Sequence, residues 1–324
     1  MFKRKKRQAD AADAPQGAVA PPEPAVAPPG PVAGAAAAPT PPANPPPGAR
    51  NLVVVVLDSL RHDTWLAAPP KSLRGLGQAE RRFSYASWTA PSHLNLLMGL
   101  LPHTSPPHVY ASDYYKQDFL RYSERLGVEG MEFKKLLPSI FLPTYLKHRL
   151  GYHTHAMVSM PVLNQHTVIN RDFDSYELMP SHNDMGAMVE RLEFDPERPS
   201  FYLLNVGETH YPYAVPGEDA SQWPRISGVH GVFKRLDDAH AGEPMGGGEF
   251  FDAKAMATLR ERQVAALEYL DDVFARLLQK LPEDTWLIVT SDHGELFGED
   301  GYFGHGPILH PKVLEVPFVE GLRP

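Results

Sequence analysis

The chain has 324 residues, a hydrophobic content of 43% and a formal net charge of −8. This length suits one large α/β domain or two small ones, and without a basic excess the chain is not expected to bind duplex nucleic acid. Fifteen histidines and no cysteine exclude thiolate metal sites, disulfides and cysteine nucleophiles. Metal or acid–base chemistry would therefore depend on histidine and carboxylate side chains.

Residues 1–50 differ in composition from the rest of the chain. They hold 13 of the 34 prolines and several blocks of alanine, so we predict a disordered tail followed by one domain over residues 51–324. The basic start, Lys3 to Arg7, offers a contact for anionic lipid or nucleic acid, although a solvated tail is the simpler interpretation. No apolar run of the length of a signal peptide or a membrane span follows. These features predict a cytoplasmic protein without a transmembrane segment.

The folded domain is expected to begin with a buried strand. Leu52 to Leu57 is an uninterrupted apolar run with four consecutive valines, which is typical of a strand covered on both faces in the middle of a parallel sheet. Asp58 and Ser59 follow directly, and Arg61 comes soon after. Ligands and chemistry collect at the carboxyl ends of such strands, which makes Asp58 a candidate metal ligand.

The segment from Tyr85 to Gly99 predicts a helix with a threonine at its start. Thr89 precedes Ala90 and Pro91 and then an apolar-periodic run, which is the pattern of an N-cap followed by proline in the first turn. Thr89 either only caps the helix or contributes its hydroxyl to chemistry. Because N-cap threonines are common, the capping interpretation is favoured when the residue is considered alone.

The middle of the chain alternates between strands and helices. Residues 103–139 are rich in Pro, Tyr and charge and are expected to form an insertion over the sheet edge. The elements predicted next are a helix over 141–150, a strand over 152–158, a helix over 183–194 and a strand over 200–206. His153 and His155 alternate with smaller residues, as on a strand with one polar face, and are interpreted as structural. His210 lies just beyond the last of these strands.

The last third begins with a long loop, residues 217–250, which we interpret as a lid or substrate-shaping segment. Residues 253–281 carry apolar side chains at three- and four-residue steps and predict a helix. Residues 286–290 and 315–319 predict two more strands. The alternation of strands and helices predicts an α/β fold with a doubly wound, mainly parallel sheet flanked by helices.

Polar side chains follow several of the predicted strand ends. The strand over 286–290 leads into Asp292 and His293, and His305 lies between glycines on the next loop. Asp58 and the Asp292–His293 pair are over 230 residues apart in the chain, as expected for a metal site assembled across a sheet. Each residue alone also fits a turn former or a surface histidine, but their shared position at strand ends favours a site.

Seven short motifs occur along the chain in the following order: Leu57–Arg61, Thr89–His93, Phe173–Tyr176, Thr209–Tyr213, Ser291–Glu295, Gly304–Gly306 and Val316–Phe318. This ordered set resembles the sulfatase-like branch of the alkaline phosphatase superfamily, over about residues 51–320. The resemblance implies that family's doubly wound fold. We expect the fold to lack the full carboxyl-terminal subdomain that is common in sulfatases.

The resemblance also implies a metal site and a nucleophile. Asp58, Asp292 and His293 would bind one divalent metal ion, and the oxygen of Thr89 would complete the site. Thr89 would be the nucleophile, because a helix start and a metal both favour its alkoxide.

Four further residues would contact the substrate in a protein of this family. His210 and His305 would hold the transferring group or protonate the leaving oxygen, acting as catalytic residues. Arg61 and His93 complete the expected substrate-binding set. His93 stands where the family usually has an arginine.

The sequence departs from true sulfatases at two important positions. Their nucleophile is a formylglycine made from Cys or Ser, and Thr89 cannot supply that aldehyde. Ser59 stands where a second acidic ligand is usual, and the smaller number of carboxylates beside His293 favours Mn²⁺ or Zn²⁺, with Ca²⁺ or Mg²⁺ as alternatives. Threonine at this position is the pattern of phosphodiesterases, phosphoethanolamine transferases and lipoteichoic-acid-type synthases.

The leading prediction is metal-dependent hydrolysis of phosphate esters, especially diesters, through a covalent threonine intermediate. The alternatives are a phosphoryl-group or phosphoethanolamine-type transferase, a sulfate-ester hydrolase, and a catalytically silent sulfatase-like binding module. The expected partner is a small-molecule or lipid-linked phosphate or sulfate ester. Substrate identity would depend on the segments over 103–139 and 217–250.

Overall fold

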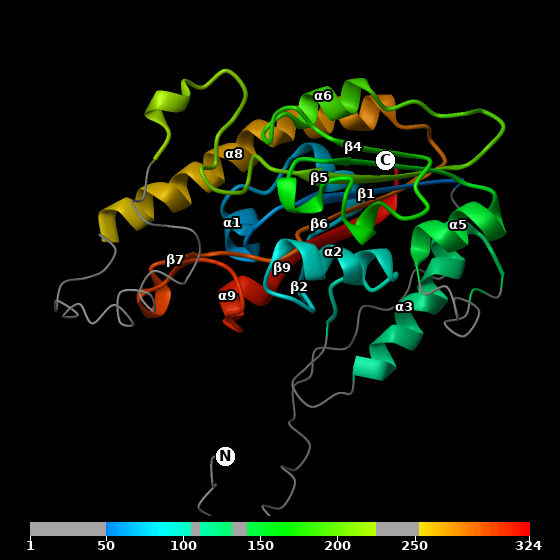
Figure 1. The fold of residues 1–324 in the computed structure, drawn as a ribbon, viewed down its shortest axis with the longest axis horizontal. Helices are drawn as coiled ribbons and strands as arrows, with labels where there is room; N and C mark the ends of the chain where they lie inside the picture. The colour runs from blue at the N-terminus through cyan, green and yellow to red at the C-terminus, as the bar shows by residue number, and fades with distance from the viewer. Residues whose placement is uncertain (1–49, 105–110, 130, 132–140, 225–252) are drawn as a thin grey trace, which may run out of the picture. The chain divides into compact units, whose positions relative to one another are not determined.

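The computed structural model describes residues 50–104, 111–129, 131, 141–224 and 253–324 (Figure 1). The predicted tail, most of the predicted loop over 217–250 and part of the segment over 103–139 lie outside these residues. None of the described helices combines the length and apolar character that crossing a membrane requires.

A seven-stranded sheet forms the centre of the domain. Its strands, in spatial order, are β2 (Glu80–Phe83), β9 (Glu315–Leu322), β6 (Thr285–Thr290), β1 (Asn51–Leu57), β5 (Ser200–Val206), β3 (His153–Val158) and β4 (Ser175–Leu178). The five strands from β6 to β4 are parallel to their neighbours, whereas β9 pairs antiparallel with both β6 and β2. The predicted mainly parallel α/β sheet is therefore confirmed.

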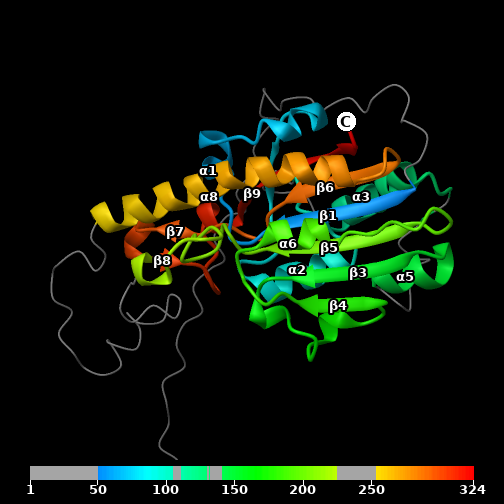
Figure 2. The ribbon, with the colours of Figure 1, turned by 90° about the horizontal axis from the view of Figure 1, so that it is seen from above.

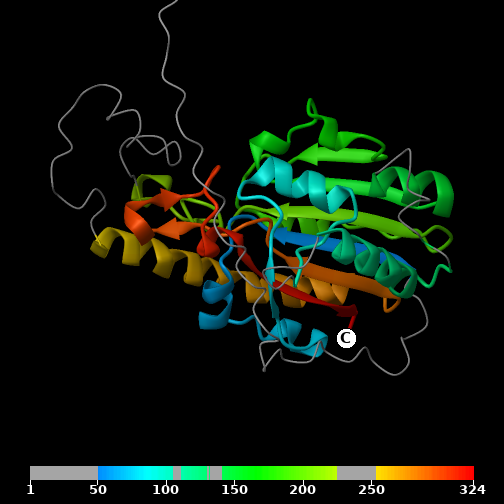
Figure 3. The ribbon, with the colours of Figure 1, turned by 90° about the horizontal axis from the view of Figure 1, so that it is seen from below.

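Helices cover both faces of the sheet (Figures 1, 2 and 3). One face packs against α1 (His62–Ala67), α6 (Met185–Glu190) and α8 (Ala253–Lys280), and the other against α2 (Thr89–Leu97), α3 (Ala111–Leu126) and α5 (Leu142–Leu150). Successive residues of a strand point to opposite faces: Val53 and Val55 enter the core beneath α8, and Leu52 and Val54 enter the core beneath α2. All seven residues of β1 are buried, which explains its continuous apolar sequence.

Short elements complete the described fold. They are the single-turn helices η1 (Ser72–Leu76), η2 (Pro161–Leu163), η3 (Val168–Asn170), η4 (Ala220–Gln222) and η5 (Glu299–Gly301), the helix α9 (Pro311–Leu314), and a hairpin of β7 (Leu296–Phe297) and β8 (Phe303–Gly304). The segment predicted only as an insertion contains α3. Among its described side chains, α3 buries Tyr122 and Leu126 in the core.

A buried carboxylate on β9 anchors α3 to the sheet. Glu320 accepts hydrogen bonds from Arg125 at 2.6 and 3.0 Å and from the Trp286 indole at 3.1 Å, and Arg121 lies 2.9 Å away. Burial opposes ionisation of Glu320, but the arginines outweigh it and lower its pKa to about 2. The anion therefore holds the buried guanidinium of Arg125 in place.

Replacing Glu320 by alanine should destabilise the fold by about 3–5 kcal/mol, because Arg125 would remain buried without its partner. Glu315→Ala is the matched control: it removes a carboxylate from the same strand whose partner, Arg81, is 58% exposed, and it should cost less than about 1 kcal/mol. Urea unfolding of both variants measures the difference. Equal losses of stability would contradict the anchoring role of Glu320.

Candidate active site

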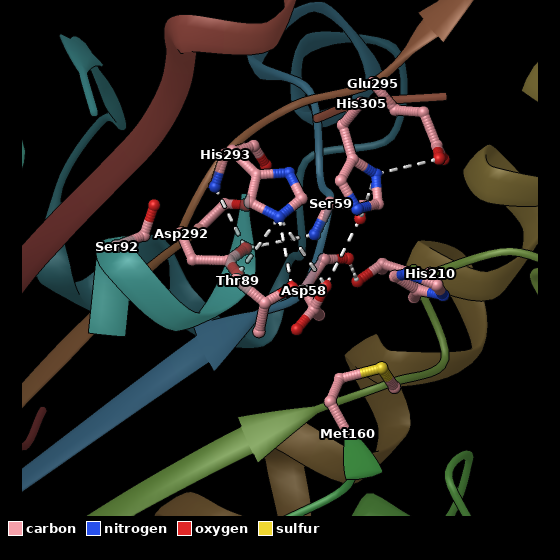
Figure 4. A network of polar contacts seen from close by, with 12 residues as sticks. Asp58, Ser59, Thr89, Ser92, Met160, His210, Asp292, His293, Glu295 and His305 are labelled. Atoms are coloured by element: carbon pink, nitrogen blue, oxygen red, sulfur yellow. Dashed lines mark hydrogen bonds and ion pairs between the residues drawn. The ribbon is translucent and has the colours of Figure 1, made fainter. Parts of the chain in front are cut away.

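Adjacent strands bring the predicted metal ligands together (Figure 4). β1 and β6 are neighbours in parallel register, so Asp58 and Asp292 follow strand ends at the same edge of the sheet. Asp58, Asp292 and His293 are fully buried or nearly so, and each offers a ligand atom within 4.8 Å of the others. In the described part of the chain, this is the one group of three or more His, Asp or Glu residues that converges in this way.

Hydrogen bonds fix the orientation of both carboxylates. Asp292 Oδ1 accepts from the backbone N–H groups of Ser59 at 3.1 Å and His293 at 2.9 Å. Asp58 Oδ2 accepts from the Asn205 amide at 2.9 Å, and Asp58 Oδ1 from the Ser59 hydroxyl at 3.2 Å. Ser59 itself has a left-handed backbone, with φ of 61°, which turns the chain sharply behind Asp58.

The donor atoms suit a divalent metal ion. Asp292 Oδ2 is buried and makes no hydrogen bond with any described residue, although a buried polar atom normally has a partner. His293 Nδ1 lies 2.9 Å from the Gly294 carbonyl, so Nδ1 carries the proton and Nε2 keeps the lone pair that a metal needs. Two carboxylates, one imidazole and the nearby hydroxyl of Thr89 form a hard, mainly oxygen ligand set.

Burial and neighbouring charges shift the pKa values of the side chains in the cluster. Burial raises the pKa of Asp292 well above its usual value, and the nearby charge of Asp58 raises it further. Burial also opposes ionisation of Asp58, but His210 and His293 outweigh it and lower the pKa of Asp58. Burial and the neighbouring His305 lower the pKa of His293 well below its usual value. His293 is therefore neutral, the state in which imidazole binds metals.

Thr89 lies against the metal-ligand cluster. Its Oγ1 is 3.3 Å from His293 Nε2 and 3.5 Å from Asp58 Oδ1. The prediction that Thr89 is the N-cap of a helix is wrong: Trp88 occupies the cap position of α2, without a capping side chain, and Thr89 is the first helical residue. The hydroxyl faces the carboxylates because it is not engaged in capping, and it keeps the benefit of the positive helix end.

His210 and His305 lie side by side next to the cluster, with ring centroids 5.4 Å apart. His210 Nδ1 is 2.9 Å from the carbonyl of Tyr211, and His305 Nδ1 is 3.2 Å from Glu295 Oε1. Burial disfavours the charged form of His305, but the hydrogen bond and charge of Glu295 outweigh it and raise the pKa of His305. Glu295 therefore favours the protonated form of His305.

Arg61 and His93 are both buried beside the cluster. Arg61 is buried and forms ion pairs with Asp63 and Glu299, each at 2.6 Å, so it joins the loop after β1 to η5. His93 is fully buried; its Nδ1 lies 2.8 Å from the Thr89 carbonyl and 3.7 Å from Asp292 Oδ2. Both side chains support the residues of the cluster, and the contact of either with substrate stays a prediction.

Sequence reasoning missed several supporting residues. Gln263 on α8 donates to the carbonyls of Ser59 and Thr209, both at 3.0 Å, and accepts from the Thr64 hydroxyl, so it joins the loops after β1 and β5. The amide in α8 interrupts an apolar face, and Asn205 interrupts an apolar strand. A polar residue at such a position is the signal that would have identified them.

Glu208 supports the turn that carries His210. It is buried, its Oε1 accepts from the Met185 backbone at 2.8 Å, and its Oε2 has no partner among the described residues. Burial raises the pKa of Glu208 to about 7, so the carboxyl stays protonated in the folded protein under mildly acidic conditions.

The sequence profile of the sulfatase family matches residues 50–319, and the chain belongs to the sulfatase family. This finding confirms the predicted family and a sulfatase-like enzyme acting on ester bonds. The seven-stranded sheet with helices on both faces is likewise the alkaline phosphatase/sulfatase-like fold.

The chain is similar to a Haloferax volcanii protein described as "Low-salt glycan biosynthesis sulfotransferase Agl7", with 25% identity over 279 residues, or 83% of this chain and 54% of that protein. It thus spans about half of that relative's length. The fold is similar to the C-terminal periplasmic domain of EcEptC from Escherichia coli, with a TM-score of 0.50 and 16% identity over 85% of this chain and 73% of that one. It is also similar to BT1596, a 2-O GAG sulfatase, with a TM-score of 0.52 and 13% identity over 84% of this chain and 64% of that one.

Removing one carboxylate should abolish tight metal binding. We expect Asp292→Ala to lose at least about 10-fold in affinity for Mn²⁺ or Zn²⁺, a loss of more than about 1.4 kcal/mol, and to keep the fold. Isothermal titration and circular dichroism measure the two properties. Asp272→Ala, on the exposed side of α8, is the control. Full metal occupancy in Asp292→Ala would contradict the ligand assignment, and a wild-type protein that binds no metal would favour a silent module.

Glu208 should make stability depend on pH. Its pKa is about 7 in the folded protein against an ordinary 4.5, so between these values the folded state holds a proton that the unfolded state has lost. Its contribution to stability is fully present below pH 4.5 and is lost as the pH rises through 7, by up to about 3 kcal/mol. Glu208→Gln removes this contribution to the pH dependence, whereas Glu261→Gln, an exposed control, leaves it unchanged. Thermal midpoints across that pH range measure the effect; parallel curves for wild type and Glu208→Gln would contradict it.

Proposed function

We propose that the chain hydrolyses phosphate esters, diesters in particular, with Thr89 as the nucleophile beside one divalent metal ion. The observation that carries the proposal is the position of the Thr89 hydroxyl, within 3.5 Å of both Asp58 Oδ1 and His293 Nε2 at the first residue of α2. A threonine with only a helical role would not need to place its hydroxyl against buried candidate metal ligands.

Asp58, Asp292, His293 and Thr89 would hold the metal. Two carboxylates and an imidazole favour Mn²⁺ or Zn²⁺ over Ca²⁺, which prefers more oxygen ligands. When bound, the ion supplies positive charge that stabilises the threonine oxygen and the oxygens of the transferring group.

The protein's own groups would then direct the reaction. The N-terminal end of α2 favours the deprotonated form of Thr89 Oγ1, whose proton passes to solvent. This oxygen forms a new bond to phosphorus as the bond to the leaving ester oxygen breaks. His305, whose pKa is raised by Glu295, passes a proton to that oxygen, with His210 beside it as a second donor. Water then cleaves the threonine phosphoester and regenerates the hydroxyl.

The nucleophile favours phosphate over sulfate. A sulfatase that uses formylglycine needs an aldehyde hydrate, and a threonine cannot become one. A threonine oxygen is suited to attack phosphorus, where His210 and His305, together with a bound metal ion, would stabilise the negative charge on the equatorial oxygens. One relative is described as a sulfotransferase, so transfer to an acceptor other than water is the alternative outcome.

Thr89→Ala should lower phosphodiester turnover by about three orders of magnitude or more, because the covalent route would be lost, while Thr89→Ser keeps a measurable part. Thr258→Ala makes the same change at an exposed position on α8 and should leave the rate unchanged. Turnover of phosphate mono- and diesters with Mn²⁺ or Zn²⁺ measures the effect, and sulfate esters should be turned over far more slowly.

Mass spectrometry provides an independent readout of the same proposal. A slowly hydrolysed substrate should add one phosphoryl-type mass to the peptide that contains Thr89. Wild-type rates in Thr89→Ala, or sulfate turnover above phosphate turnover, would contradict the proposal.

A further inference from the structure

A cavity lies on the sheet, away from the candidate active site. α6 and α8 cover β1, β5 and β6, whereas β3 and β4 extend beyond them (Figure 2). A cavity of about 700 Å³ opens on this part of the sheet. Its floor comes from β3, β4 and β5, and its wall comes from the segment after α6.

The floor of this groove is held in one arrangement. The imidazole of His155 stacks on the ring of Tyr202, with centroids 4.7 Å apart and planes at 20°. His155 Nδ1 lies 2.7 Å from the hydroxyl of Ser175, so the ring is held on its face and at one nitrogen. Tyr202 thus covers one face of the fixed imidazole, and His155 lines the cavity.

The wall is tied to the floor at three points. The Tyr202 hydroxyl donates to the carbonyl of Glu193 at 2.6 Å and lies 3.1 Å from its backbone nitrogen. Arg191 forms an ion pair with Glu177 on β4, and His153 Nδ1 lies 3.9 Å from Asp195. Because the wall is fixed, the groove keeps its shape without a ligand.

One polar atom of the floor lacks a hydrogen-bond partner, which favours a ligand in the cavity. Ser200 is 1% exposed and lines the cavity, and its hydroxyl has no hydrogen-bond partner among the described residues. A buried hydroxyl without a partner costs free energy that a hydrogen-bonding ligand recovers.

The lining selects the chemical class of the ligand. Glu177, Glu193 and Asp195 against the single cation of Arg191 disfavour an anion such as phosphate or sulfate. Imidazoles and carboxylates of this groove do not converge on a point as the Asp58 group does, which disfavours a metal ion. Hydroxyl groups both donate and accept, and a sugar also offers an apolar C–H face for a flat ring, so a neutral sugar matches the mixed donors, acceptors and imidazole face.

We propose that this groove is a saccharide-binding site separate from the catalytic centre. Ser200 and the candidate active site lie at opposite ends of β5, which are roughly 20 Å apart because a strand rises about 3.3 Å per residue. The proposal does not depend on which ester the enzyme cleaves.

The test is saturation-transfer NMR and isothermal titration of the full chain with neutral disaccharides, namely maltose, cellobiose, lactose and chitobiose. At least one should bind in the millimolar range. His155→Ala should weaken binding about 10-fold or more, equivalent to about 1.4 kcal/mol, and Ser175→Ala should weaken it less. His148→Ala, an exposed histidine on α5, is the control, and Thr89→Ala should bind sugar as the wild type does.

Three results would overturn the proposal. They are failure of every disaccharide to bind, binding unaffected by both groove variants, and binding lost in Thr89→Ala, which would place the sugar in the candidate active site. Tight Zn²⁺ binding abolished by His153→Ala would assign a metal site to the groove instead. If His155→Ala unfolds, Ser175→Ala, which changes one hydroxyl at an edge strand, decides between binding and no binding.

Discussion

Asp58 and Asp292 bring two carboxylates to the ends of neighbouring buried strands, and the arrangement of the site depends on this like-charge contact. In a buried environment the repulsion between two anions is several-fold stronger than in water. Burial and the charge of Asp58 raise the pKa of Asp292, whereas the neighbouring histidines outweigh burial and lower the pKa of Asp58. A shared divalent cation would allow both to ionise, so the geometry that is costly for two carboxylates alone is the geometry of a metal site.

This constraint explains residues that have no chemical role of their own. Ser59 and Asn205 donate to the two carboxylates, and the Gly294 carbonyl holds the proton of His293 on Nδ1. Gln263 then holds the Ser59 turn through its carbonyl. The supporting hydrogen bonds thus continue from the ligands into α8, whose apolar face packs on the sheet. Because the same helix packs the core and orients the site, a loss of packing there would also disturb the ligands.

The sequence predicted the fold best where both faces of an element are buried. From Leu52 to Leu57, β1 is apolar because both of its faces are covered. The change to a charged residue at Asp58 therefore marked its end clearly. β5 and α8 were predicted within a residue of their observed bounds for the same reason of strong, regular burial. By contrast, α3 holds the sheet through Arg125 and Glu320, an ion pair between residues almost 200 positions apart. No local pattern contains such a contact.

The convergence of the three candidate ligands was predictable, and the geometry around them was less so. Asp58, Asp292 and His293 were expected to lie close together because parallel strands end at one edge, a consequence of topology. The position of Thr89 as first helical residue, not cap, depends on the extended backbone of Trp88, and threonine itself is common in both positions. Arg61 is drawn into ion pairs with Asp63 and Glu299, of which the second is supplied by a hairpin formed far along the chain. A charged residue beside a strand end therefore has two competing uses, substrate and scaffold, and only the position of the opposite charges in the fold distinguishes them.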